Sequence, residues 1–294
     1  MKYLLIGAAA LALAACETIL PGGDDGADAK AAANSERLEA VLATFPEDVQ
    51  ARYQYRHPKE TLEFFGIEPG MTVVDSLPGT FWYSGILAAY LGPDGKVIGA
   101  DYSMPMWRLF GGFADEEWLK KQENWAETWV GGAGEWTGEG AAEVGSMVYG
   151  SVPDELAGTA DVVLLVRALH HFNRFEEEGG YFTEAFADIH KVLKLGGVIG
   201  VVQHRAPAGN SDKWAEGDNG YLKQDQIIAA FEGAGFEFVA SSEINANPKD
   251  QPTEDEFVWR LPPTLGTSEE NEELKAEIMA IGESDRMTLL FRKP

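Results

Sequence analysis

The sequence contains very little cysteine and comparatively little positive charge. Only one of its 294 residues is a cysteine, so no internal disulfide can form. It has 23 Lys and Arg against 48 Asp and Glu, which gives a formal net charge of −25. Nucleic acids and anionic lipid surfaces repel such a chain, so we expect neither as a partner.

Several catalytic and metal-binding motifs are also missing. The sequence has no HExxH, no cysteine cluster and no pair of carboxylates at ligand spacing, so no metal site is predicted. It has no GxSxG elbow, which argues against a hydrolase of that type. No repeat recurs at a fixed period, which argues against a solenoid.

The first residues are typical of an export signal. Lys2 precedes an apolar run over residues 4–15 that is too short to remain as a membrane-spanning helix. The run ends in Leu-Ala-Ala before Cys16, as in bacterial lipoprotein signals. We therefore predict that residues 1–15 are removed and that a lipidated Cys16 anchors the chain in the cell envelope, facing the periplasm. An ordinary buried cysteine in an N-terminal helix is the simpler alternative.

The segment after Cys16 is predicted to be a flexible tether over residues 17–35, rich in Gly, Asp and Ala. Residues 16–45 thus form a tether and the start of an N-terminal helix. Apolar residues at helical spacing predict helices within residues 36–66, with Pro58 starting the second.

The central part of the chain alternates between strand and helix patterns. Short apolar runs bounded by turn residues predict strands, and longer periodic segments predict helices. The expected strands are residues 72–75, 97–101, 147–149, 161–166 and 198–203, and the expected helices are residues 85–91, 183–194 and 223–233. Such alternation with short connections favours an α/β fold with a parallel sheet.

The C-terminal part differs from this alternation. Residues 236–244 and 287–292 have strand patterns, but no helix of crossover length and apolar periodicity separates them. We therefore expect these two strands to pair antiparallel, with a short helix over 274–281 in the polar segment between them.

Residues 104–145 are unusually rich in tryptophan, and one or two helices with a glycine-rich loop are expected there. Large aromatic side chains serve packing more often than recognition, so covering the sheet edge is the favoured role. An aromatic cap over a site is the alternative. The tryptophans are Trp107, Trp118, Trp125, Trp129 and Trp136.

The order of these segments resembles the class I S-adenosylmethionine-dependent methyltransferases, most of all a bacterial branch of predicted methyltransferases. The resemblance covers about residues 46–294 and is carried by EPGMTVVDSLPG, KVIGADYS, ADVVLLVRALHHF, HKVLKLGGVIGVVQHRAP, GAGFEFVASSEI and DRMTLLFRKP. It implies a Rossmann-like sheet, mostly parallel with an antiparallel C-terminal strand. It also implies S-adenosylmethionine as the cofactor and a small or lipid-like molecule as the methyl acceptor.

The resemblance places cofactor residues after the first two strands. In the family the first loop is rich in glycine because backbone approaches the ligand closely. Here only Gly79 remains, and Thr80 and Phe81 would enter the cofactor volume unless the loop is reshaped. An acidic residue after the second strand binds both ribose hydroxyls in the family, although a strand-end turn is an equal explanation for it here. The predicted cofactor residues are Asp75, Leu77, Gly79, Phe81, Asp101 and Arg167.

The strands that follow end in further polar residues. His170 or His171, after the fourth predicted strand, would act as a base or orient the acceptor, although packing explains them as well. Arg205, after the fifth, would pair with an acidic substrate or with a carboxylate of a covering loop. The N-terminal residues Arg52, Arg56 and His57 are candidates for the same cleft, and structural ion pairs account for all of them equally well.

Two other functions stay open from the sequence. The glycine-poor loop and the export signal favour a non-catalytic envelope binding protein that retains the fold. The spacing from Gly79 to Asp101 also fits a nicotinamide-dependent enzyme. The acceptor and the oligomeric state are not indicated by any motif.

Overall fold

A seven-stranded sheet forms the centre of the computed structural model, which describes residues 25–79, 81–268 and 270–294. The strand order is β3-β2-β1-β4-β5-β7-β6, and only β7 runs antiparallel to its neighbours. This arrangement confirms the predicted Rossmann-like sheet, including the antiparallel pairing of the last two strands. The strands are β1 Thr72–Ser76, β2 Lys96–Asp101, β3 Glu143–Val148, β4 Ala160–Val166, β5 Leu193–His204, β6 Glu237–Ser242 and β7 Arg286–Arg292.

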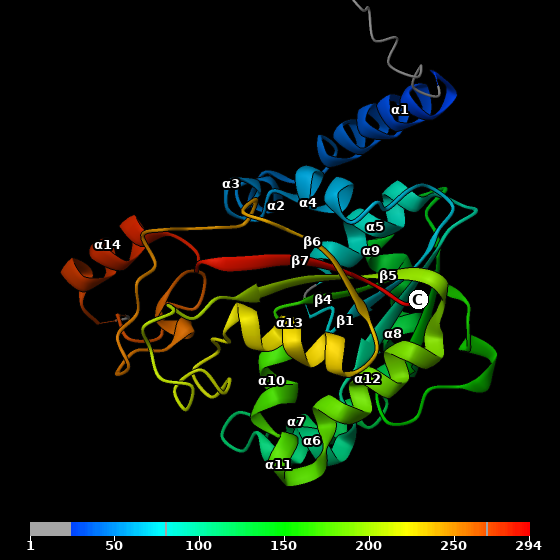
Figure 1. Cartoon of the computed structure of the whole chain (residues 1–294). Helices are drawn as coiled ribbons and strands as arrows, with labels where there is room; N and C mark the ends of the chain where they lie inside the picture. The colour runs from blue at the N-terminus through cyan, green and yellow to red at the C-terminus, as the bar shows by residue number, and fades with distance from the viewer. Residues whose placement is uncertain (1–24, 80, 269) are drawn as a thin grey trace, which may run out of the picture.

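Helices cover both faces of the sheet. In Figure 1, α4 and α5 lie above the sheet, whereas α10, α12 and α13 lie below it. The N-terminal and first crossover helices are α1 Asp25–Leu42, α2 Glu47–Gln50, α3 Tyr53–Arg56, α4 Pro58–Phe64 and α5 Trp82–Leu91. The middle group is α6 Met104–Leu109, α7 Glu116–Gln122, α8 Trp125–Gly131 and α9 Ala133–Trp136. The remaining helices are α10 Leu169–Arg174, α11 Glu176–Gly179, α12 Tyr181–Val192, α13 Gln224–Gly233 and α14 Glu272–Ile281, with 3₁₀ turns at Asp154–Leu156 and Val258–Arg260.

The hydrophobic core is divided by the sheet into two clusters. Successive residues of a strand point to opposite faces, so Val73 belongs to the cluster under α4 and α5, whereas Val74 belongs to the other. Val162 and Val163 on β4 divide in the same way. Because both faces are covered, the central strands are apolar almost throughout, which is why the sequence showed them clearly.

The N-terminal segment differs from the prediction. The tether expected over 17–35 is wrong from Asp25 onward, where α1 begins. Alanine has the highest helix propensity of all residues, and the run ADAKAAANSERLEA is rich in it. Residues 1–24, with the predicted signal and Cys16, lie outside the described part of the chain.

Two strands start earlier than the sequence indicates. β3 begins at Glu143 rather than at 147, and β5 begins at Leu193 rather than at 198. The residues KLGG before the expected β5 resemble a helix end, but Leu193 pairs with Ala160 and the ladder then shifts register. An irregularity of this kind admits the turn residues that otherwise signal a loop.

The fold places a candidate site where the parallel strands end. From β1 the chain continues to β2 on one side of the sheet, and from β4 it continues to β5 on the other side. A crevice is therefore expected between β1 and β4, at their carboxyl ends. Residues 104–145, which contain four helices rather than one or two, lie beside this edge. Within the described residues, no helix combines the length and the apolar character needed to cross a bilayer.

Candidate functional site

The loop after β1 has an unusual backbone. Leu77, Gly79 and Phe81 all have left-handed conformations, with φ values of 55°, 56° and 62°. This region is easy for glycine but costs a residue with a side chain roughly 1–2 kcal/mol. Strain of this kind persists where the surrounding structure enforces it, and it is concentrated at ligand sites. The loop is therefore reshaped to follow a tight path with only one glycine. Thr80 lies outside the described residues.

Asp101 ends β2 next to this loop. Its side chain is buried, and its two oxygens accept hydrogen bonds from the Tyr102 amide at 2.8 Å and from Trp107 Nε1 at 3.2 Å. Burial raises the pKa of Asp101 to about 7, although both hydrogen bonds act to lower it. A carboxylate oxygen has a second lone pair, so each oxygen can accept one more hydrogen bond.

An aromatic cavity of about 430 Å³ opens between the loop and Asp101. The predicted residues Leu77, Gly79, Phe81 and Asp101 all line it. Its remaining lining is mainly indole, with two polar side chains at the far wall. These other lining residues are Pro78, Trp107, Trp118, Gln122, Trp125, Thr128 and Trp129.

The tryptophans both cover the sheet and form the cavity wall. Trp129 lies on Gly99 of β2, where an added Cβ would approach the indole to 2.5 Å, and its Nε1 donates to the Gly145 carbonyl at 2.9 Å. Trp107 and Trp118 contact edge to face with centroids 4.5 Å apart. The favoured covering role is thus right for Trp129, and the alternative of an aromatic wall at a cavity also holds for Trp107, Trp118, Trp125 and Trp129. The density of tryptophan between 104 and 145 was the available signal.

Phe81 is held at the rim of the cavity by two indoles. Its ring stacks on Trp129 and on Trp136, each with centroids 5.2 Å apart. Both contacts fix the position of the ring, so the cavity remains open beside it. The prediction that Phe81 would enter the cofactor volume is therefore correct only in that its ring forms one wall of the cavity.

Asp75 lies below the loop rather than in the cavity. The Ser84 hydroxyl on α5 donates to its Oδ2, and the side chain is almost fully buried. Burial raises the pKa of Asp75 to about 6, and the nearby charge of Arg167 opposes this shift. Asp75 therefore ties α5 to the end of β1, and it does not line the cavity.

The two predicted catalytic histidines, His170 and His171, are not among the residues that line the cavity. His171 Nδ1 is 3.1 Å from the Tyr102 hydroxyl, which itself donates to the Ala168 carbonyl, so His171 must be the donor. His170 Nδ1 lies 3.3 Å from Gln203 Oε1, and its buried Nε2 has no partner among the described residues. Burial lowers the pKa of His170 to about 3 and that of His171 well below its usual range, so both are neutral at pH 7.

Arginines gather on the other side of β1, where β4, β5 and β7 meet. Arg52 and Arg286 donate to the buried carboxylate of Glu283, and Arg56 Nε lies 3.5 Å from it. Burial acts to raise the pKa of Glu283, but the three arginines hold it at about 2. Arg52, Arg56, Arg167, Arg286 and Glu283 are called the arginine cluster below.

Arg167 belongs to this cluster by position. It follows β4 with a φ of 58°, and its amide donates to the Val202 carbonyl of β5 at 2.7 Å. Burial lowers the pKa of Arg167 to about 9, and the charges of Arg56 and Arg286 lower it further. The predicted cofactor residue Arg167 therefore faces the cluster, and it is not among the residues that line the aromatic cavity.

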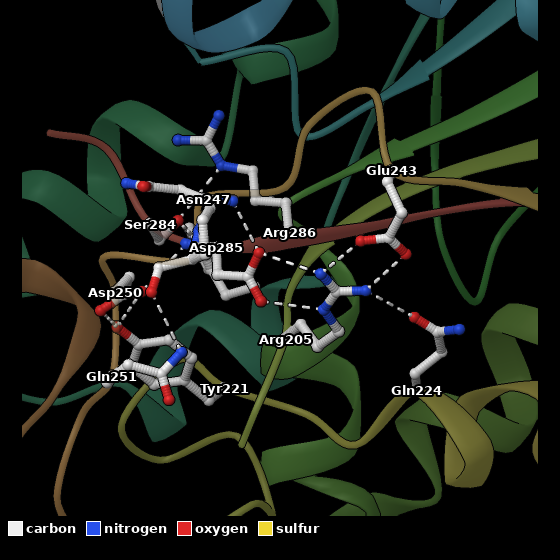
Figure 2. A network of polar contacts seen from close by, with 12 residues as sticks. Arg205, Tyr221, Gln224, Glu243, Asn247, Asp250, Gln251, Ser284, Asp285 and Arg286 are labelled. Atoms are coloured by element: carbon white, nitrogen blue, oxygen red, sulfur yellow. Dashed lines mark hydrogen bonds and ion pairs between the residues drawn. The ribbon is translucent and has the colours of Figure 1, made fainter. Parts of the chain in front are cut away.

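Arg205 is fully engaged in a separate network, shown in Figure 2. Its guanidinium makes paired contacts with Asp285 and with Glu243, and a further one with Gln224. Arg205 thus pairs with carboxylates of the chain, while pairing with an acidic substrate, the other alternative, stays a prediction. His57 is not in the cluster; it lines a shallow hollow beside α1, so its predicted place in the cleft is wrong.

Comparison with known proteins gives distant structural likenesses. No family model matches the chain, and no curated protein matches its sequence. A SAM dependent methyltransferase from Aquifex aeolicus is 13% identical, with a TM-score of 0.48, over 88% of this chain and 98% of that one. The [4+2]-cyclase SpnF is 16% identical, with a TM-score of 0.49, over 82% and 80%. An arsenic (III) S-adenosylmethionine methyltransferase from Chlamydomonas reinhardtii is 14% identical, with a TM-score of 0.41, over 87% and 73%. At these values the likenesses carry no conclusion about function.

Proposed function

We propose that this protein is an S-adenosylmethionine-dependent methyltransferase that acts on a small or lipid-like acceptor. One observation carries the proposal. A hollow of about 430 Å³, at the carboxyl ends of β1 and β2, joins the left-handed loop, the carboxylate of Asp101 and a wall of indole rings. Its volume falls in the range of roughly 300–1,000 Å³ that small-molecule sites occupy.

The lining residues fit the parts of this cofactor. The free lone pairs of Asp101 suit two ribose hydroxyls. The indoles of Trp107 and Trp125 offer faces on which an adenine can stack. Near Gly79 an added Cβ would meet only the Leu77 carbonyl, at 3.8 Å, so this glycine supports the loop by its backbone conformation.

When bound, S-adenosylmethionine supplies a methyl group attached to a positively charged sulfur. A nucleophile takes this methyl group, and the sulfur departs as a neutral thioether. The chain's contribution to such a transfer is mainly to position the two partners. Burial keeps His170 neutral, with an unpartnered Nε2 among the described residues, so it can accept a proton there as a weak base. The catalytic role of His170 and His171 stays a prediction.

Calorimetric titration of the purified protein with S-adenosylmethionine and S-adenosylhomocysteine tests the proposal. Saturable binding with one site per chain is expected for both compounds. Absence of heat at high protein concentration would reject it and would leave the non-catalytic binding protein as the better explanation. Quenching of tryptophan fluorescence by NADH would instead favour the nicotinamide enzyme.

We also propose that the chain is anchored to a membrane of the cell envelope through a lipidated Cys16. The support is the sequence before that cysteine, since residues 1–24 lie outside the described part of the chain. The wild-type chain should enter the detergent phase in a two-phase extraction, whereas Cys16→Ala should stay in the aqueous phase. Equal partition of the two chains would contradict the anchor.

A further inference from the structure

The arginine cluster carries more positive charge than its neighbours balance. Four arginines gather around one carboxylate, Glu283, and the charge of Arg167 also acts on a second carboxylate, Asp75. The nearby histidines His170 and His204 add no charge, because burial lowers the pKa of both. The cluster together with Asp75 therefore has a formal excess of two positive charges, inside a chain whose net charge is −25.

This excess is concentrated at Arg167. Arg52 and Arg286 donate to Glu283, and the guanidinium of Arg56 lies over the Trp82 ring at 4.6 Å. The Arg167 side chain, which is half-buried, has no hydrogen bond and no ion pair with any described residue. Arg56 Nε is buried without a hydrogen bond in the described structure, but it lies 3.5 Å from the Glu283 carboxylate. Charged side chains in such surroundings are normally paired, so the unpaired guanidinium of Arg167 beside this positive excess indicates a place for an anion.

Arg205 shows how this chain pairs an arginine that serves structure alone. It directly follows the last residue of β5, at the same sheet edge, and two carboxylates contact its guanidinium. In Figure 2 the guanidinium of Arg286 points away from this network. Arg205 thus has two acidic partners, whereas Arg167 has no ion pair with a described residue. A shortage of acidic residues in the chain therefore does not explain why Arg167 is unpaired.

The backbone at Arg167 supports a functional reason for this. Its φ of 58° is the third left-handed non-glycine conformation at this edge, after Leu77 and Phe81. Both the strain and the unpaired charge lower the stability of the fold, and such costs persist mainly where a ligand uses them. The side chain of Arg52 retains 26% exposure, so the cluster reaches solvent on that side.

We propose that the arginine cluster binds a carboxylate or phosphate group of the methyl acceptor. This inference rests on the proposed methyl transfer, because the cluster adjoins the cofactor cavity across the end of β1. The cofactor's own sulfonium is cationic, and its amino acid end carries both charges, so neither compensates the excess. An acceptor with an anionic group compensates the excess positive charge. Bound in this way, it also brings its nucleophile to the junction of the arginine cluster and the aromatic cavity.

The test uses inorganic phosphate and acetate as probes on the full chain, at constant ionic strength with chloride as the balancing anion. Arg167→Gln removes the unpaired charge, and Arg174→Gln is the matched control, since Arg174 pairs with the exposed Asp218. Thermal melting and calorimetry should show saturable binding of at least one probe to the wild type and to Arg174→Gln. Arg167→Gln should weaken that binding at least about tenfold, while its unliganded melting temperature stays equal to or above that of the wild type.

Arg167→Lys keeps the positive charge but lacks the planar guanidinium, so its affinity for the probe should lie between those of the wild type and Arg167→Gln. This variant preserves the test if Arg167→Gln does not fold. The inference is overturned if neither probe binds better than chloride, or if the Arg167 and Arg174 variants bind equally. It is also overturned if S-adenosylhomocysteine displaces the probe competitively, because the cluster would then serve the cofactor's carboxylate. Failure of S-adenosylhomocysteine to bind, with anion binding intact, rejects the methyltransferase proposal instead.

Discussion

The carboxyl edge of the sheet has two halves that differ in kind. Over β1 and β2 the edge is hollow, lined by indoles, and its one carboxylate, Asp101, already accepts hydrogen bonds from the chain. Over β4, β5 and β7 the edge is filled with side chains, and its arginines outnumber their acidic partners. The first half is suited to a flat ligand by shape and the second to an anion by charge.

The two halves also share a feature. Left-handed non-glycine residues stand at the ends of both strands that flank the switch point, Leu77 and Phe81 after β1 and Arg167 after β4. A fold without a ligand site has little reason to retain strain in both places. Under the proposed function the two halves would serve two parts of one reaction, and the following variants separate them.

Loss of the Glu283 carboxylate, which three arginines share, should have the largest effect. It acts only on the half of the edge over β4, β5 and β7. In Glu283→Gln, three buried or partly buried arginines lose their common partner, so the free energy of unfolding should fall by about 3–5 kcal/mol. The control is Glu243→Gln, whose carboxylate is 66% exposed and which should cost no more than about 1 kcal/mol. Urea unfolding measures both, and equal losses would contradict the central place of Glu283.

In the aromatic half, Asp101→Asn should weaken binding of S-adenosylhomocysteine by about 100-fold. The amide has an N–H₂ donor in place of one of the two carboxylate acceptors. One ribose hydroxyl therefore loses its charge-assisted hydrogen bond, and the other keeps only a weaker hydrogen bond to a neutral oxygen. Asp94→Asn, in the exposed turn before β2, is the control and should bind as the wild type does. Calorimetry would refute this role of Asp101 if both variants bound alike, whereas phosphate binding should be unchanged in each.

A smaller effect is expected when one face of the cavity wall is removed. Trp125→Ala takes away an indole that stacks on Trp129 at 5.6 Å and lines the hollow. The affinity for S-adenosylhomocysteine should fall by roughly tenfold, as for the loss of one base–aromatic stack. Trp214→Ala, whose indole stacks on Tyr221 away from the cavity, should leave the affinity unchanged. A loss of similar size in both variants would indicate a general effect on folding.

The pH dependence of stability should distinguish Asp101 from the arginine cluster. The pKa of Asp101 is raised from 3.8 to about 7 in the folded chain, so the folded state retains a proton that the unfolded state releases. The contribution of this group is fully present below pH 4 and is lost as the pH rises to about 7, by at most about 1.4 kcal/mol per pH unit. Asp75, with a pKa raised to about 6, acts with the same sign.

The buried histidines His170, His171 and His204, whose pKa values are lowered, act with the opposite sign in both proteins, so the test is the difference between the proteins. Between pH 5 and pH 7 the free energy of unfolding of the wild type should fall relative to that of Asp101→Asn. Urea titrations at several pH values measure this difference. Parallel curves for the two proteins would show that the carboxyl of Asp101 does not titrate in this range.

The sequence predicted the sheet better than the site. The strands β1, β2 and β4 are short, apolar and bounded by turn residues, and burial on both faces makes such patterns distinct. The four helices between 104 and 145 were not resolved as separate elements, because tryptophan and glycine there follow the demands of the cavity rather than a helical period.

For the site, prediction succeeded where residues are near in sequence. Leu77, Gly79, Phe81 and Asp101 flank one βαβ unit, and the cavity joins them as expected. The arginine cluster combines residues from α3, the end of β4 and the start of β7, more than a hundred positions apart, so only the register of the strands reveals it. The pairing of Arg205 and the isolation of Arg167 depend on which loops return to that edge.

A crystal structure of the protein grown with S-adenosylhomocysteine and phosphate together tests the division of the edge most directly. We expect the adenosyl group against the indoles of the cavity, with its ribose on Asp101, and phosphate on Arg167 in the arginine cluster. Phosphate in the aromatic cavity, or the amino acid carboxylate of the cofactor on Arg167 with no phosphate beside it, would contradict the assignment of the two halves.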